Sequence, residues 1–166
     1  MRKADINRTD LPLLQLKDSC LLTHIKGQFY KSTPGQLFER TFADHEIKGI
    51  DTLVSVEYFN GDLPQDIDPL TFEQLNGWFA KDKNFAYYYR PTSGGMLCAK
   101  LHNADSRSFH LLQGHYKYAA DKNYFYNEAE IIEGFIPGKT KLKLDNKGRV
   151  FQMTCNKKTY NFELVN

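Results

Sequence analysis

The 166-residue chain lacks the features that mark several common protein classes. Its three cysteines (Cys20, Cys98 and Cys155) are an odd number without framework spacing, which favours a reducing compartment over a disulfide-stapled secreted scaffold. No apolar run reaches the ~18 residues of a membrane span, and residues 11–16 are too short and too interrupted for a signal peptide. Long helical periodicity and low-complexity linkers are also missing. We expect one soluble domain over residues 1–166, in the cytoplasm, or in the periplasm if a leader has been removed.

The net charge is also small, +2 with neutral histidines, which is too little to indicate nucleic-acid binding. The charges are nevertheless unevenly distributed. Residues 49–80 contain six acidic residues and no basic one, whereas residues 139–158 contain seven basic residues and one acidic residue. Three interpretations stay open: two solvated faces, two segments that neutralise each other in the fold, or a polar recognition surface, since opposed fields steer association.

Aromatic residues are abundant: 12 Phe, 10 Tyr and one Trp make up 14% of the chain. Their side chains fit half-buried pleated surfaces, so the composition favours strands. Alternating runs at residues 53–59, 141–144 and 151–155, each followed by typical turn residues, point the same way. The predicted fold class is mainly β, an antiparallel meander of β-hairpins with short helices between repeat units. An α+β arrangement is the alternative.

An internal repeat of about 38 residues runs through the chain. Asp44, Asp82 and Asp121 each follow an aromatic residue and one or two further residues that include an alanine, and a second aspartate recurs about 24 residues after each of them. The terminal copies are degenerate, as expected where each unit must cover its neighbour. The predicted units are residues 44–81, 82–120 and 121–158, with residues 1–43 as an N-terminal cover.

The repeated aspartates predict turns and helices. Residues 82–84 and 121–123, both Asp-Lys-Asn, lie between aromatic runs, and Asp and Asn favour β-turns, so hairpin turns are expected there. The second aspartate of each good copy, Asp68 or Asp105, is a favourable helix N-cap residue. It is followed by Phe and Leu at helical spacing.

Two short helices are therefore expected, over residues 68–75 and 105–112. Gly77 and Gly114 would end them. Phe72 and Phe109 would be equivalent buried residues of the two copies.

These motifs resemble the DKNYY family of bacterial proteins. Asp121-Lys122-Asn123-Tyr124 carries the likeness, Asp82-Lys83-Asn84-Phe85 is a second match, and together with their flanks they cover roughly residues 64–134. The resemblance implies a non-enzymatic binding protein, and some relatives are immunity proteins that neutralise a toxin. It brings no catalytic residues. A bacterial immunity protein that binds and occludes a cognate toxin is thus the leading hypothesis.

Metal and catalytic sites find weaker support in the sequence. Cys20 with His24, and Cys98 with His102, could form a Cys₂His₂ zinc site only if both segments were helical, because on strands the paired residues lie too far apart. The Asp-x-Asn starts of the two turns lack the later ligands of a calcium loop. No bound zinc, calcium or cofactor is expected. A small enzyme using His and Cys stays open as an alternative.

Partner recognition is expected to use carboxylates, because a toxin acting on an anionic substrate presents a basic cleft. The predicted contact residues are Glu57, Asp62, Asp66 and Glu73, with Tyr88 and Arg90 as anchors of types favoured at hot spots. The opposite sign is the alternative, with the basic residues 139–158 facing an acidic toxin. The C-terminal hairpins could also bind nucleic acid, and the runs 87–89 and 124–126 could stack bases with the half of their rings that is exposed.

Overall fold

The structure, a computed structural model, describes residues 21–46 and 53–163. It confirms the predicted class: the described chain is mainly β, with every strand pair antiparallel. The described residues form four sheets, here named A to D in chain order, and in each sheet the strands lie side by side in sequence order. The fold is therefore a meander of hairpins without crossovers between the described strands.

The strand bounds follow the four sheets. Sheet A holds β1 (Leu22–Lys26), β2 (Phe29–Ser32), β3 (Leu37–Glu46) and β4 (Leu53–Asn60). Sheet B holds β5 (Glu73–Gln74), β6 (Phe79–Lys81), β7 (Ala86–Thr92) and β8 (Gly95–Lys100). Sheet C holds β9 (His110–Leu111), β10 (Tyr118–Ala120), β11 (Phe125–Asn127) and β12 (Glu130–Ile131). Sheet D holds β13 (Lys141–Leu144), β14 (Val150–Cys155) and β15 (Lys158–Asn161).

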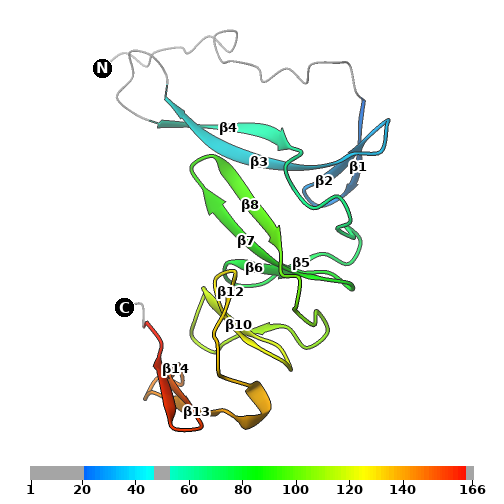
Figure 1. Cartoon of the computed structure of the whole chain (residues 1–166). Coiled ribbons are helices and arrows are strands. Elements are labelled where there is room, and N and C mark those ends of the chain that lie inside the picture. The colour runs from blue at the N-terminus through cyan, green and yellow to red at the C-terminus, as the bar shows by residue number, and fades with distance from the viewer. Residues whose placement is uncertain (1–20, 47–52, 164–166) are drawn as a thin grey trace, which may run out of the picture.

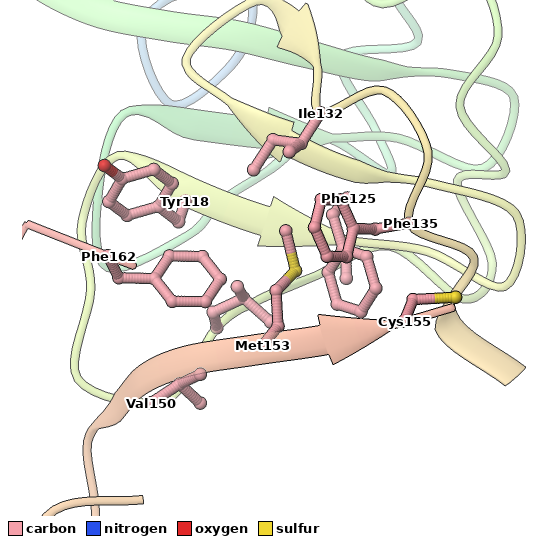
Figure 2. Close-up of a cluster of buried hydrophobic side chains, with 10 residues drawn as sticks. Tyr118, Phe125, Ile132, Phe135, Val150, Met153, Cys155 and Phe162 are labelled. Atoms are coloured by element: carbon pink, nitrogen blue, oxygen red, sulfur yellow. The ribbon is translucent and has the colours of Figure 1, made fainter. Parts of the chain in front are cut away.

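The sheets follow one another along a single elongated stack, from sheet A at one end to sheet D at the other (Figure 1). Three separate apolar cores join them. The first is shared by sheets A and B, the second by B and C, and the third by C and D. Figure 2 shows the third, where Met153 of β14 packs against Phe125 and Phe162. Each sheet thus meets only its neighbours, as in repeat proteins.

The two middle sheets are buried on both faces. In β7, Tyr87 and Tyr89 belong to the core shared with sheet A, whereas Ala86 and Tyr88 belong to the core shared with sheet C. The three tyrosines are 0–5% exposed. The expectation that half of such a run lies at the surface is wrong here, because neighbouring sheets cover both faces of the strand.

Sheets B and C are the two good copies of the repeat. Their strand orders match, and both Asp-Lys-Asn segments form the expected hairpin turns, between β6 and β7 and between β10 and β11. Each turn closes with the same backbone hydrogen bond, Asp82 N–H to Phe85 at 2.9 Å and Asp121 N–H to Tyr124 at 3.0 Å. The predicted hairpins of sheet D are also confirmed.

The predicted helices are wrong. Residues 68–71 and 105–108 each make one turn, closed by an N–H of residue 71 or 108 on the carbonyl of residue 68 or 105 at 3.2 Å. The chain then enters β5 or β9 instead of continuing as helix, because its backbone groups pair with the next strand. A single 3₁₀ helix, Pro137–Lys139, is the only helix in the described residues.

Two further predictions need correction. Asp44 lies within β3, so the degenerate first copy lacks the hairpin turn of the other two copies. Gly77 ends no helix; its backbone passes so close to Tyr116 that a Cβ would lie 2.5 Å from the Tyr116 carbonyl oxygen. Phe109 is buried at 1% exposure, whereas its equivalent Phe72 is only partly buried.

Truncating the two phenylalanines should therefore have unequal effects. Phe109→Ala should lower the free energy of unfolding by about 3–5 kcal/mol, because it opens a cavity between sheets B and C. Phe72→Ala should cost clearly less, since part of that ring already meets solvent. Denaturant unfolding of both variants measures the difference, and equal losses would contradict the unequal burial.

Glu39 of β3 is an unusual member of the core between sheets A and B. It is 1% exposed, the Tyr89 hydroxyl donates a hydrogen bond to its Oε1, and its Oε2 has no hydrogen-bond partner. Burial raises the pKa of this carboxyl, and hydrogen bonds from Tyr89 and Gln28 oppose the rise. The uncharged acid is thus favoured in the folded state.

This burial predicts a pH dependence of stability. Because the folded pKa of Glu39 lies above its ordinary value of 4.5, its stabilising contribution is complete below that value and is lost as pH rises through the folded pKa. Glu39→Gln removes the titration, so its melting temperature relative to wild type should increase from acidic to neutral pH. Glu130→Gln is the control, because this exposed side chain has no hydrogen bond or ion pair among the described residues. A flat difference for Glu39→Gln would refute the assignment.

Candidate interaction surfaces

The aspartates of the two Asp-Lys-Asn turns are structural. Asp121 is 2% exposed; its Oδ1 accepts the N–H groups of Asn123 at 2.6 Å and Tyr124 at 2.8 Å. Its Oδ2 accepts the Tyr126 hydroxyl at 3.0 Å and the Asp105 N–H at 2.7 Å. All four contacts hold the repeat together, which leaves this carboxylate no capacity for a ligand.

Asp82 repeats this arrangement in sheet B. It accepts the N–H groups of Asn84 and Phe85 at 2.7 and 2.8 Å, the Tyr87 hydroxyl at 2.7 Å and the Asp68 N–H at 2.8 Å. The same four donor types occupy the same oxygens as at Asp121. The two carboxylates on which a calcium loop would depend are therefore already occupied by hydrogen-bond donors of the fold itself.

Replacement of one carboxylate oxygen by an NH₂ group tests this structural role of the two aspartates. Asp121→Asn and Asp82→Asn place an NH₂ group against N–H or O–H donors, so each should lower the free energy of unfolding by about 1.5–3 kcal/mol. Asp62→Asn, at an exposed side chain, should change it by less than about 0.5 kcal/mol. Denaturant unfolding gives all three values, and a neutral Asp121→Asn would contradict the buried network.

The predicted acidic contact residues do not gather on one surface. Glu57 lies on the outer face of sheet A and pairs with Arg40 at 3.4 Å, and Asp66 pairs with Lys100. Asp62 and Glu73 are exposed but lie apart, in the segment after β4 and in β5. Basic residues from other strands thus neutralise part of the acidic segment.

The Asp68 carboxylate is occupied by its own turn and by Lys83, although the helix that it was expected to cap is absent. Its carboxylate accepts the Leu70 N–H at 3.1 Å and pairs with the Lys83 ammonium at 2.7 Å. The Lys83 ammonium, together with the other hydrogen bonds, holds the pKa of Asp68 below its usual range. In sheet C, Lys122 lowers the pKa of Asp105 in the same way.

Of the two expected anchors, Tyr88 is buried and Arg90 is partly exposed. Tyr88 is 5% exposed in the core between sheets B and C, and its hydroxyl donates to Glu128 at 2.6 Å. Burial, with this hydrogen bond, raises the pKa of Tyr88 to about 12. The Arg90 guanidinium lies 4.9 Å from the centre of the Trp78 ring. Tyr88 must therefore be withdrawn as a contact residue, because it packs inside the fold.

The cysteines offer little reactivity. Cys98 and Cys155 are both buried, and burial raises the pKa of Cys98 to about 12, which disfavours the nucleophilic thiolate. His102 is exposed although Cys98 is buried, so this pair does not face one site. Cys20 lies outside the described residues. Within residues 21–46 and 53–163, no group of three His, Cys, Asp or Glu side chains could hold a metal ion.

A shallow groove of about 780 Å³ lies beside the turns of sheets B and C. Its polar wall includes Lys83, His102, Arg107, Lys122 and Asp105. The two lysines pair with Asp68 and Asp105. The groove wall therefore carries charges of both signs and offers no concentrated charge of one sign.

The strongest unbalanced charge lies on sheet D. We call the following exposed lysines, on β13, its flanking segments and the β14–β15 turn, the basic end: Lys139, Lys141, Lys143, Lys147, Lys157 and Lys158. None of them has a carboxylate within ion-pair distance among the described residues. Arg149 differs, because it pairs with Asp145 at 2.8 Å.

Exposed apolar side chains accompany these lysines. Ile136 is 47%, Leu142 41% and Leu144 53% exposed. The Lys-Leu-Lys-Leu alternation of β13 suggests one buried face, but all four residues of this edge strand are exposed. The excess of lysines over acidic residues was the sequence signal for the basic end. The exposure of Leu142 and Leu144 was missed, because alternation of polar and apolar residues does not reveal that a strand lies at the edge of a sheet.

Comparison with known proteins yields no match: no family model matches the chain, and neither a curated protein nor a solved structure matches it. Among the helices of the described residues, none has the length and apolar character needed to cross a membrane.

Proposed function

We propose that the protein is a non-enzymatic binding protein whose basic end docks onto an acidic protein surface. The observation that carries the proposal is the set of six exposed lysines without carboxylate partners in the described residues. Such a field accelerates encounter with an acidic partner and selects against basic ones. Leu142 and Leu144 are also exposed on this edge strand, on the opposite side from Lys141 and Lys143, and they add apolar area beside the charged surface.

The resemblance to the DKNYY family extends this proposal to an immunity protein that neutralises a toxin by occlusion. Occlusion needs a rigid surface, not a reactive group. The two-sided cores and the buried turn carboxylates supply that rigidity. The sign of the contact is the reverse of the leading sequence hypothesis, because the acidic segment 49–80 is partly neutralised whereas the basic end is not.

Nucleic acid is the second candidate, since exposed lysines also attract phosphates. The aromatic runs disfavour it. Residues 87–89, together with Phe125 and Tyr126, are at most 5% exposed and cannot stack bases, and Tyr124 is 37% exposed. An enzyme is disfavoured by the burial of Cys98, whose thiol is held in its protonated form.

Charge reversal at the basic end tests the proposal. Lys141→Glu combined with Lys143→Glu should slow association with the captured and then purified partner by at least about tenfold and reduce its salt dependence. A matched control, Lys31→Glu with Arg107→Glu, changes the net charge equally at exposed positions elsewhere and should bind like wild type. Surface plasmon resonance at low and high salt gives the rates.

The acidic hypothesis is tested in the same assay. Asp62→Lys combined with Glu73→Lys should leave binding intact if the basic end is the docking surface. Loss of binding in this variant, with the basic-end reversal silent, would overturn the proposal. Binding of labelled nucleic acid in a mobility-shift assay, lost on the Lys141 and Lys143 reversal, would replace it with the second candidate.

A further inference from the structure

The end of the stack opposite to the basic end carries acidic and apolar side chains on an open face. In β3, buried Thr41 and Ala43 alternate with exposed Phe42, Asp44 and Glu46, so the exposed set lies on the face of sheet A that points away from sheet B. This face has no covering element among the described residues, in contrast to both faces of sheets B and C.

Sheet pairing extends this face onto β4. Glu57 lies opposite Phe42, and Leu53 lies opposite Glu46, so all four side chains share one side of the sheet. Phe42 is 58% and Leu53 59% exposed, which are large values for residues of this size. We call these residues, with Asp44, the acidic end.

A ring cluster continues the apolar part of the same face. The Tyr30 ring centre lies 4.9 Å from those of both His24 and Phe59. Tyr30 and Phe59 are partly exposed. The outer face of sheet A thus combines aromatic surface with the carboxylates of Asp44 and Glu46, which have no ion-pair partner among the described residues, and with the Glu57–Arg40 pair.

The two ends of the stack are complementary in charge and both are apolar. Figure 1 places β3 and β4 at one end and β13 and β14 at the other. Five of the nine large exposed hydrophobic side chains of the described residues lie at these ends: Phe42, Leu53, Ile136, Leu142 and Leu144. Repeat proteins usually close such ends with polar capping units, because an open end is an adhesive surface.

We propose that the acidic end docks onto the basic end of a second copy of this chain, so that copies associate head to tail. Asp44 and Glu46 would face Lys141 and Lys143, which share one side of β13, whereas Leu142 and Leu144 lie on its other side, opposite Met153 and Val150. The contact is heterologous, because the two surfaces differ, and it leaves one free end of each kind on every assembly. Open chains of copies result, and their length grows with concentration.

Charge complementarity favours a second copy over the N-terminal residues of the same chain as the occupant. Residues 1–20 contain four basic and three acidic residues, a net charge of +1. A charge this small attracts the carboxylates of the acidic end only weakly. The basic end offers six exposed lysines. The inference goes beyond the proposed function, which concerns only the basic end and a different partner.

A charge-swap pair tests the inference with the purified full chain alone. The acidic-end variant carries Asp44→Lys and Glu46→Lys, and the basic-end variant carries Lys141→Glu and Lys143→Glu. Each variant alone has two ends of like charge, so its self-association should weaken at least about tenfold. Mixed one to one, every junction again joins opposite charges, and association should return to near the wild-type level.

Sedimentation velocity over a range of concentrations, at low and high salt, gives the readout. Wild type should form a concentration-dependent series of species that shrinks at high salt. Asp62→Lys with Glu73→Lys is the matched control, and it should associate like wild type. Circular dichroism checks that each variant is folded.

Three outcomes would overturn the inference. Wild type that stays monomeric at every concentration would show that no second copy occupies the acidic end, whether or not residues 1–20 cover it. Association that stops at a dimer would indicate a closed, symmetric contact. Failure of the mixed variants to associate, with both folded, would exclude the charge pairing. The acidic-end variant keeps the basic end intact, so partner binding can succeed or fail independently of self-association.

Discussion

The buried carboxylate of the Asp-Lys-Asn turn is the interaction on which the middle of the fold depends. The strands of sheets B and C are only two to seven residues long, too short to persist through ladder hydrogen bonds alone. Asp82 and Asp121 add four hydrogen bonds each, and they reach the turn itself, a tyrosine of the same hairpin and the segment that leads into the sheet. One carboxyl side chain thus holds together the backbone of the turn, the backbone of the segment that leads into the sheet and a buried tyrosine ring.

Two-sided burial explains the composition of the repeat. A small residue stands opposite a large one in each copy: Ala80 pairs with Tyr87, and Ala119 pairs with Tyr126. All four are at most 1% exposed. An alanine leaves room for the ring across the strand, so the aromatic-Ala pattern seen in the sequence is a packing rule. The high aromatic content follows, because short strands must fill two cores with few side chains.

Turn residues made much of this fold predictable from the sequence. The features that depend on contacts between distant segments were not predictable. The Asp-Lys-Asn hairpins could be placed because Asp and Asn specify local backbone geometry. The helices at residues 68–75 and 105–112 could not be excluded, since an N-cap and a one-turn loop begin with the same hydrogen bonds. Burial of Tyr88 was invisible because it depends on a second sheet far along the chain.

The pairing of charges could not be predicted from the sequence for the same reason. Acidic residues 57, 66 and 68 find bases only through pairing across strands and turns, which no linear reading of the segment reveals. Inside the stack, Lys83 and Lys122 in the hairpin turns neutralise Asp68 and Asp105, which lie in the segments that lead into the same sheets. Sheets A and D each have only one neighbour. On their outer faces Glu57 pairs with Arg40, but Asp44, Glu46 and the lysines of the basic end have no ion-pair partner among the described residues, so the ends of a linear stack are where a second molecule gains most by docking.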